Sequence, residues 1–458
     1  MDCSEERIKH LLDCQSFCSH FPYHDTHFIC GEGTINHQPV FIIMNRGKDC
    51  EFNVHWQWRT IDHIIQTTER AAVSGVPLIY VQDKLGASDT HFNTTNVFSE
   101  DMSSLLLSPS GMGKVSASLA RFSRRNVLIS VILGPTSGPL ALPLMLADLV
   151  FMTERGAFCM GRPDMVKAML AEVSDLYSLG GAMMHARHSG QVQCVVETES
   201  VLFSRLRTLF SLLFPRQHAI DFIQPDEVNV DNIIPMDHRV PYDMHRLLSV
   251  FIDKESFFEC SPDYAQEVIT GCAKVQGNPF IVIANNPKYK GGAIYRQSAT
   301  KMVRMINLAA KCHTPILFIA DVPGFMIGKV AESSGIFSAA AELFKAHVNC
   351  EVPKLFLVAR KAYTGGVFAL GGPGFNPTAV LAYPQANIGV YSVETMNKIM
   401  TTSLSEQENN ILAILKAEVS HPERLKEKGL LTDVITISQT REKIMTYLFS
   451  DSANPASF

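Results

Sequence analysis

No long basic segment, no long uninterrupted hydrophobic run and no CxxC pair of cysteines occurs in the sequence. Its 458 residues include 40 Lys and Arg and 45 Asp and Glu, which give a formal net charge of −5. A weakly acidic chain without basic clusters is a poor candidate for binding nucleic acid. The most apolar stretch, residues 140–152, contains Pro143 and Asp148 and is too short to span a bilayer, so we expect no membrane partner.

The 11 cysteines are an odd number and lack the spacing of a zinc ribbon. We expect them to be reduced, buried thiols, as in a cytosolic protein. The first ten residues, MDCSEERIKH, are charged and lack the apolar core of a signal peptide. These features predict a cytoplasmic location, and because no HExxH motif is present we expect no metal in this chain.

Four pairs of short apolar segments recur in the same order in the two halves of the chain, with their last residues 226 to 240 positions apart. The pairs are residues 40–45 with 280–285, 77–83 with 315–321, 127–134 with 353–360, and 157–161 with 388–392. Short apolar strands that alternate with helical stretches indicate α/β layering. We therefore predict two similar α/β domains, joined by the polar, proline-containing residues 224–241.

Segments rich in glycine and small residues follow several of the predicted strands. They are residues 84–87, 134–138, 323–325 and 364–366. No P-loop, no GxSxG motif and no complete dinucleotide fingerprint is present. Glycine at a strand end lets a ligand approach the backbone and leaves amide N–H groups available at the next helix. Such amides stabilise a developing oxyanion, so we predict catalysis by main-chain donors rather than by a side-chain nucleophile.

Longer motifs resemble the carboxyltransferase component of biotin-dependent acyl-CoA carboxylases, of the propionyl-CoA carboxylase β-subunit type, in the crotonase superfamily. They are DVPGF (321–325), VPK (352–354), RKAYTGG (360–366), YDMHRLLSVFIDKESFFE (242–259), ANNP (284–287), LGGAMMHARHSG (179–190) and GLLTDVI (429–435). The resemblance implies an α/β fold of two tandem crotonase-like (ClpP/crotonase) domains with ββα superhelix repeats. It also implies a homo-oligomer, a hexamer, with residues 1–225 on the acyl thioester side and residues 240–458 on the biotin side.

The resemblance further implies how such a protein works. Carboxybiotin releases CO2 in a dry site, the ureido oxyanion takes the α-proton of a coenzyme A thioester, and the enolate captures the CO2, with backbone oxyanion holes for both anions. The sequence has neither an ATP-grasp signature nor an AMKM biotinyl-lysine site. The biotin carboxylase and the biotin carboxyl carrier are therefore expected on separate chains.

By position in these motifs, Gly365 and Gly366 are expected to bind the ureido oxygen. Tyr363 and Thr364 complete this biotin-side segment, which reads YTGG against a usual YGGA. Phe368, Gly324 and Phe325 are expected to contact the substrate.

On the thioester side the resemblance assigns Gly86 and Gly138 to catalysis, and Leu85, Ala87, Pro139 and Leu140 to the substrate. This side departs from the family pattern, with KLGAS for SGGAR and GPTSGPL for GPCAGGA. Because proline has no amide hydrogen, Pro139 removes one expected donor, unless Leu140 or the Leu85–Gly86 loop supplies it. An altered acyl chain, or a carrier-protein thioester in place of coenzyme A, is one reading of these changes.

Two alternatives to a carboxylase subunit stay open at this point. A related decarboxylase would use the same oxyanion holes to release CO2 from a carboxylated thioester. A catalytically degenerate paralogue would keep the fold as a structural partner in a carboxylase complex.

Overall fold

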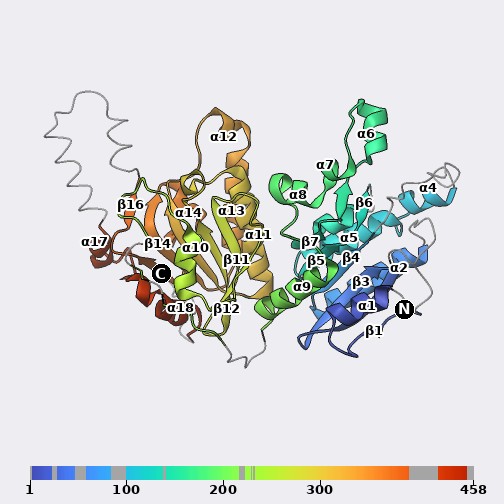
Figure 1. Ribbon diagram of the computed structural model, residues 1–458, viewed down its shortest axis with the longest axis horizontal. Helices are drawn as coiled ribbons and strands as arrows, with labels where there is room; N and C mark the ends of the chain where they lie inside the picture. Colours follow the sequence, from blue (N-terminus) through green and yellow to red (C-terminus); the bar gives the residue numbers. More distant parts are fainter. Residues whose placement is uncertain are drawn as a thin grey trace. The chain divides into compact units, whose positions relative to one another are not determined.

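The computed structural model describes residues 3–22, 28–46, 58–83, 100–137, 141–215, 222–227, 229–230, 233–390 and 421–450. The chain divides into two compact units, Met1–Phe214 and Pro215–Phe458 (Figure 1). Six residues that the sequence singled out lie outside the described residues: Leu85, Gly86, Ala87, Gly138, Pro139 and Leu140. The predicted thioester-side residues are thus not described, whereas the predicted biotin-side residues all are.

Unit 1 is built on a seven-stranded sheet of order β1-β2-β3-β4-β5-β7-β9 and a small sheet of β6 and β8. The strands are β1 (Cys18–Ser19), β2 (Phe28–Ile35), β3 (Gln38–Asn45), β4 (Leu78–Gln82), β5 (Leu128–Ile132), β6 (Pro135–Ser137), β7 (Leu149–Thr153), β8 (Ala157–Cys159) and β9 (Cys194–Val196). The helices are α1 (Cys3–Leu11), α2 (Trp58–Ser74), α4 (Glu100–Leu107), α5 (Met112–Ser123), α6 (Pro163–Leu170), α7 (Leu176–Gly180), α8 (Ala182–Met184) and α9 (Glu199–Leu213), with short turns η3 (Leu142–Leu146) and η4 (His185–Ser189).

The core of unit 1 lies between the sheet and amphipathic helices. Helix α2 buries Ile61, Ile64 and Ile65 on one stripe, as its 3.6-residue periodicity requires. This stripe packs with side chains of α5 and the strands in one apolar cluster. The parallel strands β4, β5 and β7 are buried along their whole length, and α9 contacts β7 and β9.

Unit 2 repeats this plan with a sheet of order β10-β11-β12-β13-β14-β15-β17, in which β16 pairs with the end of β14. The strands are β10 (Phe258–Glu259), β11 (Val268–Val275), β12 (Asn278–Asn285), β13 (Ile316–Val322), β14 (Lys354–Tyr363), β15 (Ala379–Ala382), β16 (Asn387–Gly389) and β17 (Asp433–Val434). The helices are α10 (Met244–Phe251), α11 (Arg296–Cys312), α12 (Lys329–Ser333), α13 (Ile336–Asn349), α14 (Gly365–Ala369), α17 (Pro422–Glu427) and α18 (Thr440–Leu448), with turns η5 (Lys290–Gly292), η6 (Pro373–Phe375) and η7 (Ile437–Gln439).

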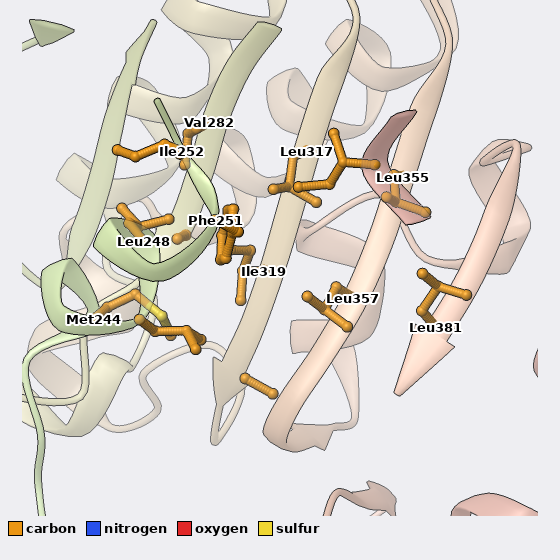
Figure 2. Close-up of a cluster of buried hydrophobic side chains, with 14 of the residues drawn as sticks. Met244, Leu248, Phe251, Ile252, Val282, Leu317, Ile319, Leu355, Leu357 and Leu381 are labelled. Carbon is orange, nitrogen blue, oxygen red and sulfur yellow. The ribbon is translucent and has the colours of Figure 1, made fainter. Parts of the chain in front are cut away.

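Alternate residues of the parallel strands in unit 2 face opposite helical layers. Leu317 and Ile319 of β13 lie in one apolar cluster with Leu248 and Phe251 of α10 (Figure 2). Helix α18 contributes Ile444 and Leu448 to the same cluster. Phe318, between them in sequence, faces the other way and contacts a side chain of α13. Helices α11 and α13 pack against each other on this second side (Figure 1). Both sides of the central strands are covered, which explains their continuous apolar sequence.

The predicted repeat is visible in the strand pairing. In unit 1, β2 and β3 pair antiparallel from Phe28↔Asn45 to Ile35↔Gln38, and in unit 2, β11 and β12 pair from Val268↔Asn285 to Val275↔Asn278. Each of the eight segments noted above overlaps a strand, and paired segments fall on corresponding strands.

The repeat extends to a buried or half-buried aspartate that fixes the turn of the hairpin in each unit. The carboxylate of Asp13 accepts hydrogen bonds from the turn amides of Asn36 and His37, and that of Asp253 accepts them from Gln276 and Gly277. All four turn residues have positive φ. Each carboxylate also pairs with an arginine from the last long helix of its unit, Asp13 with Arg207 at 2.8 Å and Asp253 with Arg441 at 2.6 Å.

Part of the stretch expected to link the two halves belongs to unit 2. Ile233 and Ile234 are buried in its apolar cluster, 1% and 5% exposed. The expectation that residues 224–241 form a simple linker was therefore wrong for these residues, because apolar side chains within the stretch find cover in the unit 2 core.

Candidate functional site

Three loops meet where β12, β13 and β14 end. The amide of Ile294, in the loop after β12, donates to the carbonyl of Gly324 over 3.0 Å, and the amide of Met326 donates back to Ile294 over 2.8 Å. Ile294 and Phe325 thereby form an isolated parallel bridge. The carboxyl ends of parallel strands are the usual place for a ligand site in α/β sheets, so this edge of unit 2 is the candidate site.

The turn from β14 into α14 has an unusual backbone. Thr364 has φ 45° and ψ −131°, a combination that glycine normally adopts in the first central position of a type II′ turn. Its amide donates to Gly389 of β16 over 3.1 Å, and its carbonyl accepts from Val367 over 3.2 Å. A non-glycine residue held in such a conformation costs about 1–3 kcal/mol and persists only where its surroundings fix it.

The loops after β13 and β14 are packed so closely that glycine is required at their contact. A Cβ on Gly366 would lie 2.8 and 2.9 Å from the methyl carbons of Val322. Gly324 has φ 124°, and a Cβ there would lie 2.9 Å from Oγ1 of Thr364. A Cβ on Gly365 would lie 3.0 Å from the ring of Phe325. The structure thus brings together the DVPGF and YTGG segments that the sequence singled out.

Two backbone amides of this junction point to an anion site. Gly365 and Gly366 are the first two residues of α14, where helix N–H groups have no partner within the helix. Within the described part of the chain, no acceptor is found for either amide. Two adjacent free amides are donors of the type that stabilise a developing oxyanion.

A buried ion pair supports the strand ends beneath these loops. Asp321 and Arg360 come from adjacent strands, β13 and β14, and their side chains are almost fully buried. The Nη1 of Arg360 also donates to the carbonyls of Asp237 and Val240 over 3.1 and 2.9 Å, and the guanidinium lies 4.8 Å from the ring centre of Tyr242. Burial next to Asp321 raises the pKa of Tyr242 well above its usual value, so its phenol stays protonated.

The other end of α14 is held by His347 of α13. This side chain is fully buried, and its Nε2 donates to the carbonyl of Ala369 over 2.9 Å. Burial lowers the pKa of His347 to about 4, so the ring is neutral near pH 7. Its ring packs against Phe318 and Phe375, and Gly371 with φ 68° leaves it room, since a Cβ there would lie 3.0 Å from its Cε1.

The predicted biotin-side residues do not all share one environment. Six of them form the junction of the two loops: Gly324, Phe325, Tyr363, Thr364, Gly365 and Gly366. Phe368, expected to contact the substrate, lies on α14 with 52% of its surface exposed. Sequence reasoning gave no role to Asp321, Arg360 or His347. For Asp321 and Arg360, a charged residue within an apolar strand was a signal in the sequence. For His347 the sequence offered no such signal.

Two general features concern the described residues only. None of their helices has the length and apolarity needed to cross a membrane. No group of three or more His, Cys, Asp or Glu side chains among them is arranged to hold a metal ion.

Comparisons with known proteins agree with this architecture. The solved structure of transcarboxylase 12S, described as a hexamer assembly with methylmalonyl-coenzyme A and methylmalonic acid bound, superposes with a TM-score of 0.86 over 99% of this chain and 90% of that one, at 24% identity. At that identity the match shows the fold alone. The predicted fold of two tandem crotonase-like α/β domains is confirmed.

Sequence comparison identifies the family. A family model described as the carboxyl transferase domain matches residues 9–458. The uncharacterized carboxylase YngE of Bacillus subtilis (strain 168) is 32% identical over 404 residues, which are 85% of this chain and 77% of that protein. The propionyl-CoA carboxylase beta chain of Cereibacter sphaeroides is 27% identical over 477 residues, 96% of this chain and 89% of that protein. The chain belongs to the carboxyl transferase family.

Proposed function

We propose that this chain is the carboxyltransferase subunit of a biotin-dependent carboxylase, moving a carboxyl group from carboxybiotin to the α-carbon of an acyl thioester. The observation that supports this most directly is the pair of amides of Gly365 and Gly366, where the β13 and β14 loops meet, for which no acceptor is found among the described residues. Family membership supplies the reaction class. The biotin carboxylase and the biotin carboxyl carrier are proposed to be separate chains, and the subunit a hexamer like transcarboxylase 12S.

The residues present fit a ureido group bound at unit 2. Bound biotin supplies the carboxyl group and then an anionic ureido oxygen. The amides of Gly365 and Gly366 are the donors proposed for that oxygen, and Gly324 leaves room beside them for the side chain of Thr364. The biotin side is accordingly assigned to residues 240–458, which belong to unit 2.

The thioester is assigned to the first half, residues 1–225. Gly86 and Gly138 are proposed to serve its carbonyl oxygen, with Leu85, Ala87, Pro139 and Leu140 near the acyl group. Pro139 lacks an amide hydrogen, so the substrate preference is expected to differ from that of acetyl- or propionyl-CoA carboxylases. A Pro139→Gly variant that gains turnover of either thioester would support this; ordinary wild-type efficiency with both would contradict it.

One experiment separates the proposed function from its alternatives. The full chain is incubated without ATP with methylmalonyl- or malonyl-CoA, with and without free biotin, and both released CO2 and carboxybiotin are measured. Transfer that requires biotin supports the carboxyltransferase. CO2 release that is independent of biotin indicates a decarboxylase. Complete inactivity, with co-purification with an active homologue, indicates a structural paralogue.

A further inference from the structure

Thr364 is an exception among the described residues with positive φ. The others that are not glycine are Gln15, Asn36, His37, Ala171, Glu255, Ser261, Ala265, Gln276, Lys290, His313 and Asn376. None of these is β-branched, and a β-branched residue fits a positive φ worst because both substituents on its Cβ crowd the backbone. A glycine at position 364 would adopt the same backbone without strain.

The surrounding backbone keeps Thr364 in this conformation. Its amide is bound to Gly389, and the neighbouring Tyr363 pairs in register with the same residue of β16. Its carbonyl accepts the amide of Val367 in the first turn of α14. The turn cannot relax without breaking the β14–β16 pairing or the start of α14, so the strain is a built-in feature of the site.

The side chain of Thr364 lies in the junction of the two loops. Its Oγ1 is 2.9 Å from the place that a Cβ on Gly324 would occupy, so the hydroxyl fills space that the glycine leaves open. The residue is partly accessible to solvent. No described residue makes a hydrogen bond to this hydroxyl, and the next two residues along the chain are Gly365 and Gly366, whose amides also have no acceptor among the described residues.

We propose that Thr364 is a specificity-determining residue of the biotin-side site, whose hydroxyl donates a hydrogen bond to the ureido group held by the Gly365 and Gly366 amides. This inference rests on the proposed function. The structure retains a strained threonine where glycine is the relaxed choice, and its hydroxyl, without a described partner, lies in the loop junction on the residue that directly precedes the two donors. Strain retained next to a ligand site indicates that the side chain is used there.

Three variants of the full chain test the role of the hydroxyl. Thr364→Val keeps the shape and the strain but removes the hydroxyl, so we expect an unchanged melting temperature and about a tenfold lower kcat/KM for free biotin, the value of one hydrogen bond. Thr364→Ser keeps the hydroxyl and should stay within about threefold of the wild type. Thr364→Gly should melt at a higher temperature and yet transfer more slowly. The KM for the thioester should not change in any of them.

The outcomes separate this inference from the function on which it rests. Wild-type transfer to biotin reports the proposed function before any variant is compared. If the wild type is active, a Thr364→Val variant with full kcat/KM would overturn the role of the hydroxyl. A Thr364→Gly variant with an unchanged or lower melting temperature would contradict the backbone strain at this position. His313→Gly is the matched control, since His313 has φ 52°, is exposed and precedes β13 at its opposite end. It should leave biotin kinetics unchanged.

Discussion

The Nε atom of Arg360 donates to Oδ2 of Asp321 over 2.9 Å, and the two side chains are 1% and 0% exposed. The pair joins β13 and β14 directly below the two loops of the candidate site. Removing one partner of such a pair leaves an uncompensated buried charge. The same guanidinium fixes residues 237 and 240 on unit 2, so it stabilises both the strand ends and the segment that enters the unit.

Arg360→Met is therefore expected to destabilise unit 2 by about 3–5 kcal/mol, measured by chemical denaturation followed by circular dichroism. Lys345→Met is the control, because Lys345 pairs with Glu342 at the surface, where both side chains are more than half exposed. Equal stability of the two variants would contradict the structural role of the buried pair.

The neutral state of His347 predicts a pH-dependent stability. Its folded pKa of about 4 lies below the ordinary 6.5, so between these values the unfolded chain binds more protons than the folded one. The free energy of unfolding then rises with pH across this window and falls as the pH is lowered through it. His347→Phe should reduce the slope of the free energy of unfolding against pH by an amount that corresponds to at most one bound proton. It should also remove the hydrogen bond that holds α14 at Ala369. Stability curves of the two proteins that stay parallel from pH 4 to 6.5 would refute the assignment.

The duplicated carboxylates predict separate effects on the two units. Both tryptophans, Trp56 and Trp58, lie in unit 1, so their fluorescence reports that unit alone. Asp13→Ala should shift the unfolding transition that is followed by tryptophan fluorescence. Asp253→Ala should leave that transition in place and shift only the unfolding of unit 2, which is followed by circular dichroism. Asp253→Ala should be the costlier change, about 2 kcal/mol or more, because Asp253 is 2% exposed and Asp13 is 15% exposed. A fluorescence shift caused by Asp253→Ala would contradict this division.

Gly366→Ala tests the close packing of the two loops. Its new methyl group would meet Val322 at under 3 Å, so the start of α14 or the end of β13 must shift. We expect at least a tenfold loss in biotin turnover, an order-of-magnitude expectation for a misplaced donor. Gly374→Ala is the matched control in the next turn, since a Cβ there has nothing within 4 Å. Similar turnover of both variants would show that the packing does not position the donors.

The repeat was predictable from the sequence because buried strands are short, continuous apolar runs that recur in the same order in both halves, as in residues 40–45 and 280–285. The junction of DVPGF and YTGG was predictable because the ends of neighbouring parallel strands lie at one edge. The roles of Arg360 and His347 were not predictable from the sequence. Their partners, Asp321 and Ala369, are 39 and 22 residues away along the chain, and only folding brings them together. The positive φ of Thr364 was also hidden, since threonine gives no local signal for it.

The central claim is that backbone amides at the end of β14 stabilise the ureido anion, and a comparison of Gly365→Pro with Gly365→Ala tests it most directly. Proline is tolerated at the first position of a helix but has no N–H, and alanine adds a Cβ while keeping the donor. In transfer from methylmalonyl-CoA to free biotin, we predict a kcat about 10²–10³-fold lower for Gly365→Pro than for Gly365→Ala, with both proteins folded. Equal kcat values for the two would contradict the claim.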